Sequence, residues 1–129
     1  MKLNKLDHLV LTVRDIKVSC DFYVKILGME EKSFGQGRKA VVFGDQKINF
    51  HQLGNKFEPR AARPTPGSGD ICFITGHPLS EVMAHLQSCG VEIIVGPLER
   101  TGATGPITSV YIRDPDQNLI EIAAYQSDI

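Results

Sequence analysis

The sequence predicts an α+β fold built from two tandem βαβββ modules. The 129 residues, of which 42% are hydrophobic, suit a single compact domain. Strand-like alternation and helix-like periodicity follow one another in the same order in both halves. The spacing from His8 to Gly28 also equals the spacing from Asp70 to Gly90. We therefore assign the domain to residues 1–129, with a first module at about 5–53, a linker at 54–69 and a second module at about 70–125.

The first module begins with a strand over residues 6–13, in which every second side chain is aliphatic. Asp15 is a good N-cap for the helix that follows, and apolar residues recur at helical spacing up to Gly28. Glycine at that position favours a left-handed C-cap. Turn-forming glycines then separate three short strands. These strands are predicted at residues 30–34, 38–43 and 47–52.

The second module repeats this order after the linker, whose prolines and glycines suit neither a helix nor a sheet interior. A strand is predicted at residues 70–75, followed by a helix that Pro78 opens and Gly90 ends. The run Asp-Pro-Asp-Gln-Asn predicts a strong turn before the last strand. The remaining strands are predicted at residues 91–95, 108–113 and 119–124, with a glycine-rich loop at residues 100–106.

Composition and charge exclude several classes of function. The net charge is −1 and no stretch gathers one sign, so we expect no nucleic-acid partner. No apolar run reaches the roughly 20 residues that span a bilayer, and no signal peptide precedes the first strand. We therefore expect a cytoplasmic protein with no membrane partner. The three cysteines are far apart, which argues against a disulfide framework and a zinc-thiolate site.

Polar side chains gather on the sheet faces that the helices should leave uncovered. Strand alternation places His8, Asn49 and His51 on such a face in the first module, and Asp70 and Glu121 in the second. Imidazole and carboxylate donors without a thiolate suit Zn, Ni, Mn, Co or Fe(II).

Several further side chains are candidates for contact with a small substrate. Arginine binds anionic groups through paired hydrogen bonds. We expect the uncovered sheet faces to enclose a cavity, and a tyrosine on the seventh strand either lines that cavity or packs in the core. The substrate-binding candidates are Arg38, Arg100, Tyr111 and Arg113.

Three motifs resemble the vicinal oxygen chelate superfamily, which includes glyoxalases, bleomycin-resistance proteins and dioxygenases. They are the strand around His8, the helix from Phe22-Tyr23 to Leu27-Gly28, and the segment at 114–121. The resemblance covers nearly the whole chain and implies a cupped half-barrel with the helices outside. Segments 43–47, 57–59 and 100–106 are similar to the group called glyoxalase domain-containing protein five and its bacterial relatives.

The resemblance also implies that metal ligands come from the first, fourth, fifth and eighth strands. His8 matches the first ligand and Glu121 the last, whereas Asp70 stands where the superfamily commonly has histidine. On the fourth strand Asn49 aligns with Glu121, and the stronger ligand His51 lies two residues further along the same face. We therefore predict one divalent metal ion bound by His8, His51, Asp70 and Glu121, with Asn49 contacting the substrate.

A glyoxalase-like lyase or isomerase is the leading prediction of function. A small substrate would bind the metal through two neighbouring oxygens, and Glu121 would act as the base that forms an enediolate. One alternative is an extradiol-type Fe(II) dioxygenase that uses His8, His51 and Glu121 as its facial triad. A fosfomycin-type thiol transferase and a metal-free drug-binding protein are further alternatives. In each case we expect a homodimer.

Overall fold

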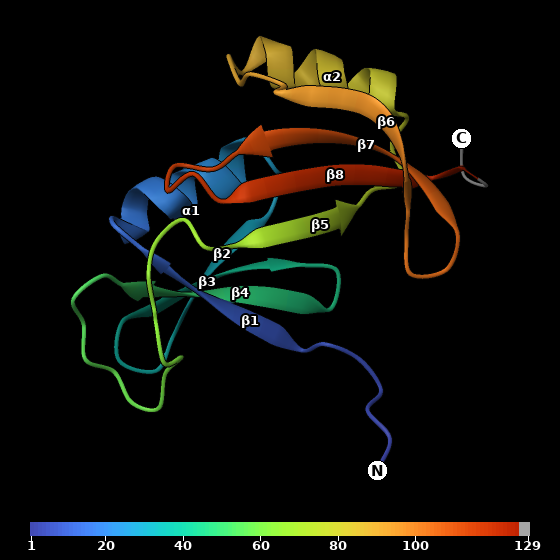
Figure 1. The fold of residues 1–129 in the computed structure, drawn as a ribbon. Coiled ribbons are helices and arrows are strands. Elements are labelled where there is room, and N and C mark those ends of the chain that lie inside the picture. Colours follow the sequence, from blue (N-terminus) through green and yellow to red (C-terminus); the bar gives the residue numbers. More distant parts are fainter. Residues whose placement is uncertain (127–129) are drawn as a thin grey trace. The chain divides into compact units, whose positions relative to one another are not determined.

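The computed structural model describes residues 1–126. The chain divides into two compact units, and the boundary between them along the sequence falls between Gly67 and Ser68. Each unit contains one βαβββ module, as Figure 1 shows, so the predicted α+β class and the repeated order are confirmed. The first unit contains β1 (His8–Val13), α1 (Ile16–Lys25), β2 (Glu30–Phe34), β3 (Arg38–Phe43) and β4 (Gln46–Gln52). The second contains β5 (Asp70–Ile74), α2 (Leu79–Ser88), β6 (Val95–Thr101), β7 (Pro106–Arg113) and β8 (Leu119–Tyr125).

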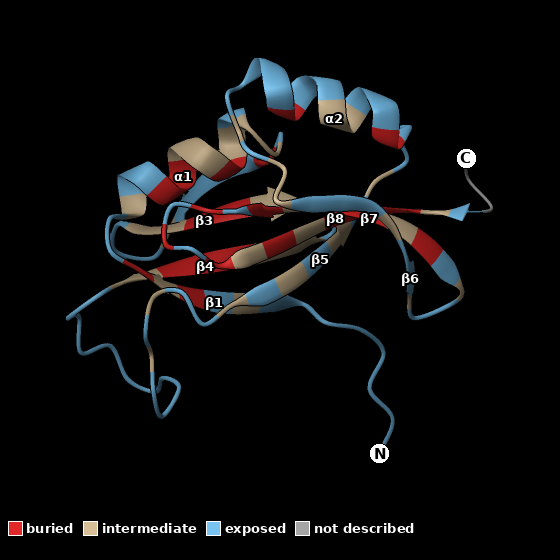
Figure 2. Cartoon of the chain, turned by 45° about the horizontal axis from the view of Figure 1, so that its top comes forward, coloured by how far each residue is buried: buried red, intermediate tan, exposed pale blue. Residues whose placement is uncertain are grey.

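The sheet of the first unit has the strand order β1-β4-β3-β2, with β1 parallel to β4 and the other pairs antiparallel. Asp15 caps α1 as predicted, because its carboxylate accepts a hydrogen bond from the N–H of Val18 at 3.2 Å. The helix packs on one face of the sheet, where the ring of Tyr23 lies 5.7 Å from that of Phe50. Figure 2 shows buried residues along β3 and β4.

The face of this sheet away from α1 carries the polar side chains. Because side chains alternate along a strand, residues two apart share a face, and paired residues of neighbouring strands share it too. We call this surface the helix-free face of the first unit. It consists of His8, Val10, Thr12, Glu30, Lys32, Phe34, Arg38, Ala40, Val42, Lys47, Asn49 and His51.

The second unit repeats the topology with the strand order β5-β8-β7-β6. Leu86 of α2 is buried, as are Val110 and Ile112 of β7 and Ile120 of β8, which form the apolar layer of this unit. No helix within residues 1–126 is long and apolar enough to cross a membrane. The helix-free face of the second unit consists of Asp70, Cys72, Ile74, Val95, Leu98, Arg100, Ile107, Ser109, Tyr111, Arg113, Leu119, Glu121, Ala123 and Tyr125.

The predicted position of the sixth strand is wrong. Residues 91–94 form no strand, and β6 runs from Val95 to Thr101. The strand thus includes Gly96 and Pro97, a pair that is typical of the end of a strand. Proline is tolerated there because β6 is an edge strand and its register with β7 shifts between Val95 and Leu98, so Pro97 lies outside the paired rungs. The predicted loop at residues 100–106 is correspondingly shorter.

Gly96 is the position where this edge strand most needs glycine. Its φ is +114°, and a Cβ atom there would lie 2.5 Å from the carbonyl oxygen of Ser109. Both the backbone conformation and the close approach therefore exclude a side chain.

We expect Gly96→Ala to lower the free energy of unfolding by about 2–4 kcal/mol, because β6 must move away from β7. Urea denaturation measures the change. Gly76→Ala is the matched control, since no atom lies within 4 Å of a Cβ there, and it should change stability by less than about 1 kcal/mol. Equal stabilities of the two variants would contradict this account of β6.

Candidate functional site

The parallel pairing of β1 with β4 decides which side chains of the first unit are neighbours. His8 lies opposite Lys47, Val10 opposite Asn49 and Thr12 opposite His51. The rung of His51 is thus four residues beyond that of His8. At roughly 3.3 Å per residue, the two histidines are about 13 Å apart along the strands. The structure does not bring these two predicted metal ligands together.

His8 is held by the residue before it. Its Nδ1 donates a hydrogen bond of 2.7 Å to a carboxylate oxygen of Asp7. This bond, aided by the charges of Lys5 and Lys47, keeps the pKa of the Asp7 carboxyl below its usual value. A carboxylate on one ring nitrogen fixes the tautomer and leaves the other nitrogen as a metal donor. The Nε2 atom of His8 is therefore arranged as a ligand.

His51 and Asn49 have a different environment on the same strand. The ring of His51 lies 5.1 Å from that of Phe57, between ring centroids. Burial of the ring, together with the charge of Arg38, lowers the pKa of His51. Asn49 is buried, and within residues 1–126 neither its Oδ1 nor the Nε2 of His51 has a hydrogen-bond partner.

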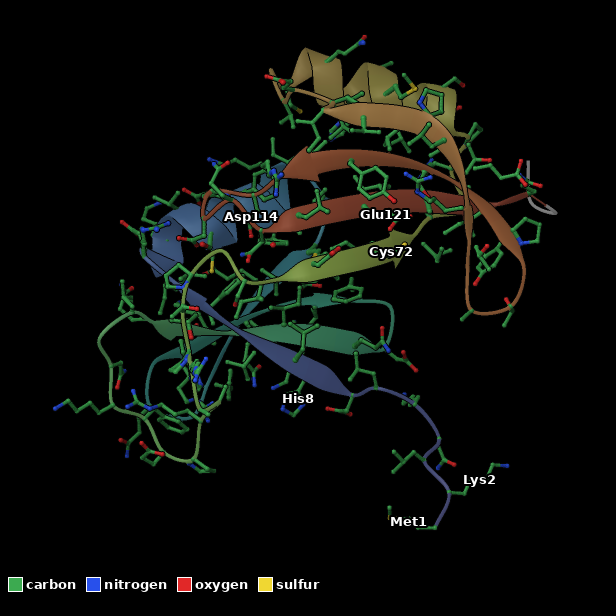
Figure 3. The ribbon with its side chains drawn as sticks, in the orientation of Figure 1. Met1, Lys2, His8, Cys72, Asp114 and Glu121 are labelled. Atoms are coloured by element: carbon green, nitrogen blue, oxygen red, sulfur yellow. The ribbon has the colours of Figure 1, made fainter. Side chains whose placement is uncertain are left out.

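Glu121 lies at the centre of the helix-free face of the second unit, opposite Cys72 of β5 and Tyr111 of β7 (Figure 3). The hydroxyl of Ser109 donates a hydrogen bond of 2.6 Å to Oε2 of Glu121. Partial burial and the neighbouring Glu121 carboxylate raise the pKa of the Cys72 thiol to about 11. Cys72 is therefore a neutral neighbour of Glu121 at physiological pH, and not a nucleophile.

Asp70 begins β5 and is exposed, opposite Leu119 and one strand away from Glu121 on the same face. Asp70 comes two residues before Cys72, the partner of Glu121 on β5. In the same way, His8 comes two residues before Val10, the partner of Asn49 on β1. The repeat of the module extends to the register of its parallel strands.

The arginine candidates of the second unit already have partners. Arg100 donates from Nε to the hydroxyl of Tyr111 at 3.0 Å, which joins two predicted substrate contacts on one face. Arg113 donates to the carbonyl oxygen of Gln117 at 3.3 Å and so braces the turn before β8.

That turn fixes where β8, the strand of Glu121, begins. The buried carboxylate of Asp114 accepts the backbone N–H groups of Asp116 and Asn118 at 2.9 Å, and the amide of Asn118 at 2.8 Å. Asn118 in turn accepts the N–H of Gly69 at 2.7 Å. The turn thus ties the start of β5 to the start of β8.

The predicted ligand side chains are each of a chemical type that binds divalent ions. Within residues 1–126 no three His, Cys, Asp or Glu side chains are grouped closely enough to hold a metal by themselves. His8 nevertheless offers an oriented imidazole nitrogen and Glu121 an oriented carboxylate, a donor chemistry that suits borderline ions such as Zn²⁺, Ni²⁺ or Mn²⁺. The sequence analysis missed Asp7 and Ser109, although Asp7 is adjacent to His8 and Ser109 shares the face of Tyr111.

Comparison with known proteins identifies the family. The sequence model of the Glyoxalase/Bleomycin resistance protein/Dioxygenase superfamily matches residues 5–122. The chain belongs to this superfamily.

Three relatives are similar over nearly the whole chain. Virulence protein STM3117 of Salmonella typhimurium is 55% identical over 125 residues, which cover 97% of this chain and 87% of that protein. Its crystal structure has a TM-score of 0.95 to this superfamily member, with 97% and 99% of the two chains covered. Glyoxalase domain-containing protein RDO1 of Mycosarcoma maydis is 52% identical over 126 residues, 98% of this chain and 71% of that protein. The integron cassette protein VCH_CASS1 of V. cholerae is 58% identical, with a TM-score of 0.96 and 98% of both chains covered.

More distant structures share only the fold with this superfamily member. A lactoylglutathione lyase from Agrobacterium tumefaciens is 18% identical (TM-score 0.73, 95% of both chains). The antibiotic-binding protein TnmS3 of Streptomyces is 21% identical (TM-score 0.76, 98% and 99%). The fosfomycin-resistance protein FosX of Listeria monocytogenes, crystallised with Mn(II), is 24% identical (TM-score 0.65, 97% and 93%). One fold therefore serves enzymes and binding proteins, so the function must be argued from the site.

We expect Asp114→Ala to lower the free energy of unfolding by about 2–4 kcal/mol, because three buried donors lose their acceptor. Thermal or urea unfolding measures the loss. Asp45→Ala removes an exposed turn carboxylate that pairs with Lys5, and it should cost less than about 1 kcal/mol. A stability of Asp114→Ala close to that of Asp45→Ala would show that the turn does not hold β8 in place.

Proposed function

We propose that this chain is a divalent-metal-dependent lyase or isomerase that acts on a small substrate with two neighbouring oxygens. The observation that carries the proposal is the paired orientation of two donors. Asp7 holds His8, and Ser109 holds Glu121, each through a short hydrogen bond that leaves donor atoms available. Histidines and carboxylates that bind metal ions typically have such hydrogen-bonded partners, which orient them.

The proposed ligands are His8, Glu121 and Asp70. Asp70 adds a carboxylate on the same face as Glu121. We leave His51 out of this set, because its rung lies about 13 Å along the strands from that of His8. The ion would supply Lewis acidity, which stabilises negative charge on the substrate oxygens.

Glu121 is the proposed general base. Its carboxylate would take the proton from the substrate carbon next to the carbonyl and return a proton to the neighbouring carbon, so the reaction consumes no oxidant. The hydroxyl of Ser109 holds Oε2, which keeps the carboxylate aimed at one place during both transfers. The net result is an isomerisation, as in a glyoxalase-like reaction on the thiol adduct of a 2-oxoaldehyde.

The register disfavours the dioxygenase alternative. A facial triad of His8, His51 and Glu121 needs both imidazoles on one ion, and the pairing of β1 with β4 separates them. The thiol transferase and the drug-binding protein are supported only by likeness of fold to FosX and TnmS3. The homodimer and the cytoplasmic location stay predictions from the sequence.

Metal binding tests the ligand set first. Protein purified without an affinity tag and loaded with Zn²⁺ should hold about one ion per chain, and His8→Ala and Glu121→Gln should each weaken the affinity by about 10- to 100-fold. Competition with a chromogenic chelator measures the affinity. His77→Ala and Glu99→Gln are the matched controls, because both side chains are exposed and lie away from the helix-free faces. Unchanged affinity in both site variants would refute the ligand set.

Proton exchange tests the reaction. The metal-loaded enzyme, given the glutathione adduct of methylglyoxal in D₂O, should form a product that contains deuterium at the former carbonyl carbon. At saturating metal, Glu121→Gln should lower kcat by about 10²- to 10⁴-fold, because the base is lost. Mass spectrometry and NMR measure both quantities. Turnover of a catechol that consumes oxygen, with no reaction of the thiol adduct, would instead establish the dioxygenase.

A further inference from the structure

A group of cationic and aromatic side chains occupies the helix-free face of the first unit beside Asn49. The guanidinium carbon of Arg38 lies 4.6 Å from the ring centroid of Phe34 and 4.3 Å from that of Phe57. Lys47 places its Nζ 4.1 Å from the centroid of the Phe34 ring. We call these residues, with Asn49 and His51, the Arg38 cluster: Phe34, Arg38, Lys47, Asn49, His51 and Phe57.

The positive charge of this cluster has little local compensation. Within residues 1–126 neither Arg38 nor Lys47 forms an ion pair, and the acidic group that senses Lys47 is Asp7, which is already bonded to His8. Two rings flank the guanidinium of Arg38, so its orientation is restrained while its in-plane N–H groups stay free to donate. Such a guanidinium is prepared to bind a carboxylate through two parallel hydrogen bonds.

Two polar atoms of the same cluster are buried without partners. Asn49 is 4% exposed, yet its Oδ1 accepts no hydrogen bond within the described part of the chain. The Nε2 of His51, two residues further along the same face, is also buried and unpaired. Buried polar atoms in folded proteins are nearly always paired, so these two atoms point to a bound group. Asn49 Oδ1 accepts only, and therefore requires a donor such as a hydroxyl.

We propose that the Arg38 cluster binds the hydroxycarboxylate end of a small anionic substrate. The carboxylate pairs with Arg38 in the field of Lys47, and the adjacent hydroxyl donates to Oδ1 of Asn49. His51 forms a further hydrogen bond to the bound substrate through its Nε2 atom. The inference rests on the proposed function in that it narrows the substrate class to hydroxy acids, whereas the thiol adduct of the reaction test has no carboxylate beside its hydroxyl. The binding itself requires no metal ion.

The test is a titration of the ¹⁵N-labelled protein in EDTA, followed by NMR. The probes are L-lactate, its neutral amide lactamide, and propionate, which lacks the hydroxyl. L-lactate should shift the side-chain amide of Asn49 and the backbone amides of β4 saturably. Lactamide and propionate should each bind at least about tenfold more weakly, because one loses the charge and the other the hydroxyl.

Variants separate this cluster from general electrostatic attraction. Arg38→Gln should weaken L-lactate binding by about tenfold or more, and Arg38→Lys should weaken it less, since it keeps the charge without the planar fork. Lys39→Gln is the matched control, because it removes one positive charge from the same strand on the opposite face, and it should bind like the wild type. Circular dichroism confirms the folded state of each variant.

Three results would overturn the inference: no saturable shift with L-lactate, equal binding of L-lactate and lactamide, or an affinity unaffected by Arg38→Gln. The titration contains neither metal nor turnover, so its failure leaves the ligand set of His8 and Glu121 untouched. A normal titration with failed metal binding would instead remove the proposed reaction and retain the anion subsite.

Discussion

The parallel pairing of the first and last strands in each module governs the rest of this structure. A parallel ladder fixes a single register, and one register decides which side chains of the two strands stand beside each other. In the first unit it places Asn49 beside Val10 and separates His51 from His8. In the second it places Glu121 beside Cys72. The proposed division into a metal ligand set and an anion subsite follows from these two registers.

Neighbouring side chains then give the functional groups their direction. Asp7 fixes the ring of His8, Ser109 fixes the carboxylate of Glu121, and the rings of Phe34 and Phe57 restrain Arg38. In each case a group that titrates or carries charge is held by a contact that leaves its reactive atoms free. Binding sites of this kind lose little conformational entropy when the ligand arrives.

Local chemistry made much of the fold predictable from the sequence. Asp15 caps its helix, and Gly28 has the left-handed φ of +71° that its position requires. The sixth strand was misplaced because Pro97 marks a break by local rules, whereas an edge strand tolerates it. Alternation correctly gives the face on which a side chain lies, and Asn49 and His51 share that face. Alternation does not show which residue of the neighbouring strand a side chain lies opposite, because that depends on the register of the two strands. The sequence therefore could not show that His51 lies far from His8.

The most direct test of the account is a long-range ¹H–¹⁵N NMR spectrum of the histidine rings, recorded before and after one equivalent of Zn²⁺. Nitrogen-15 shifts of imidazole respond strongly to metal binding, and the four histidines can be assigned by substitution. The account predicts that Nε2 of His8 moves to the shift of a metal-bound nitrogen while the ring of His51 does not. Joint movement of His8 and His51, or movement of His51 alone, would contradict it.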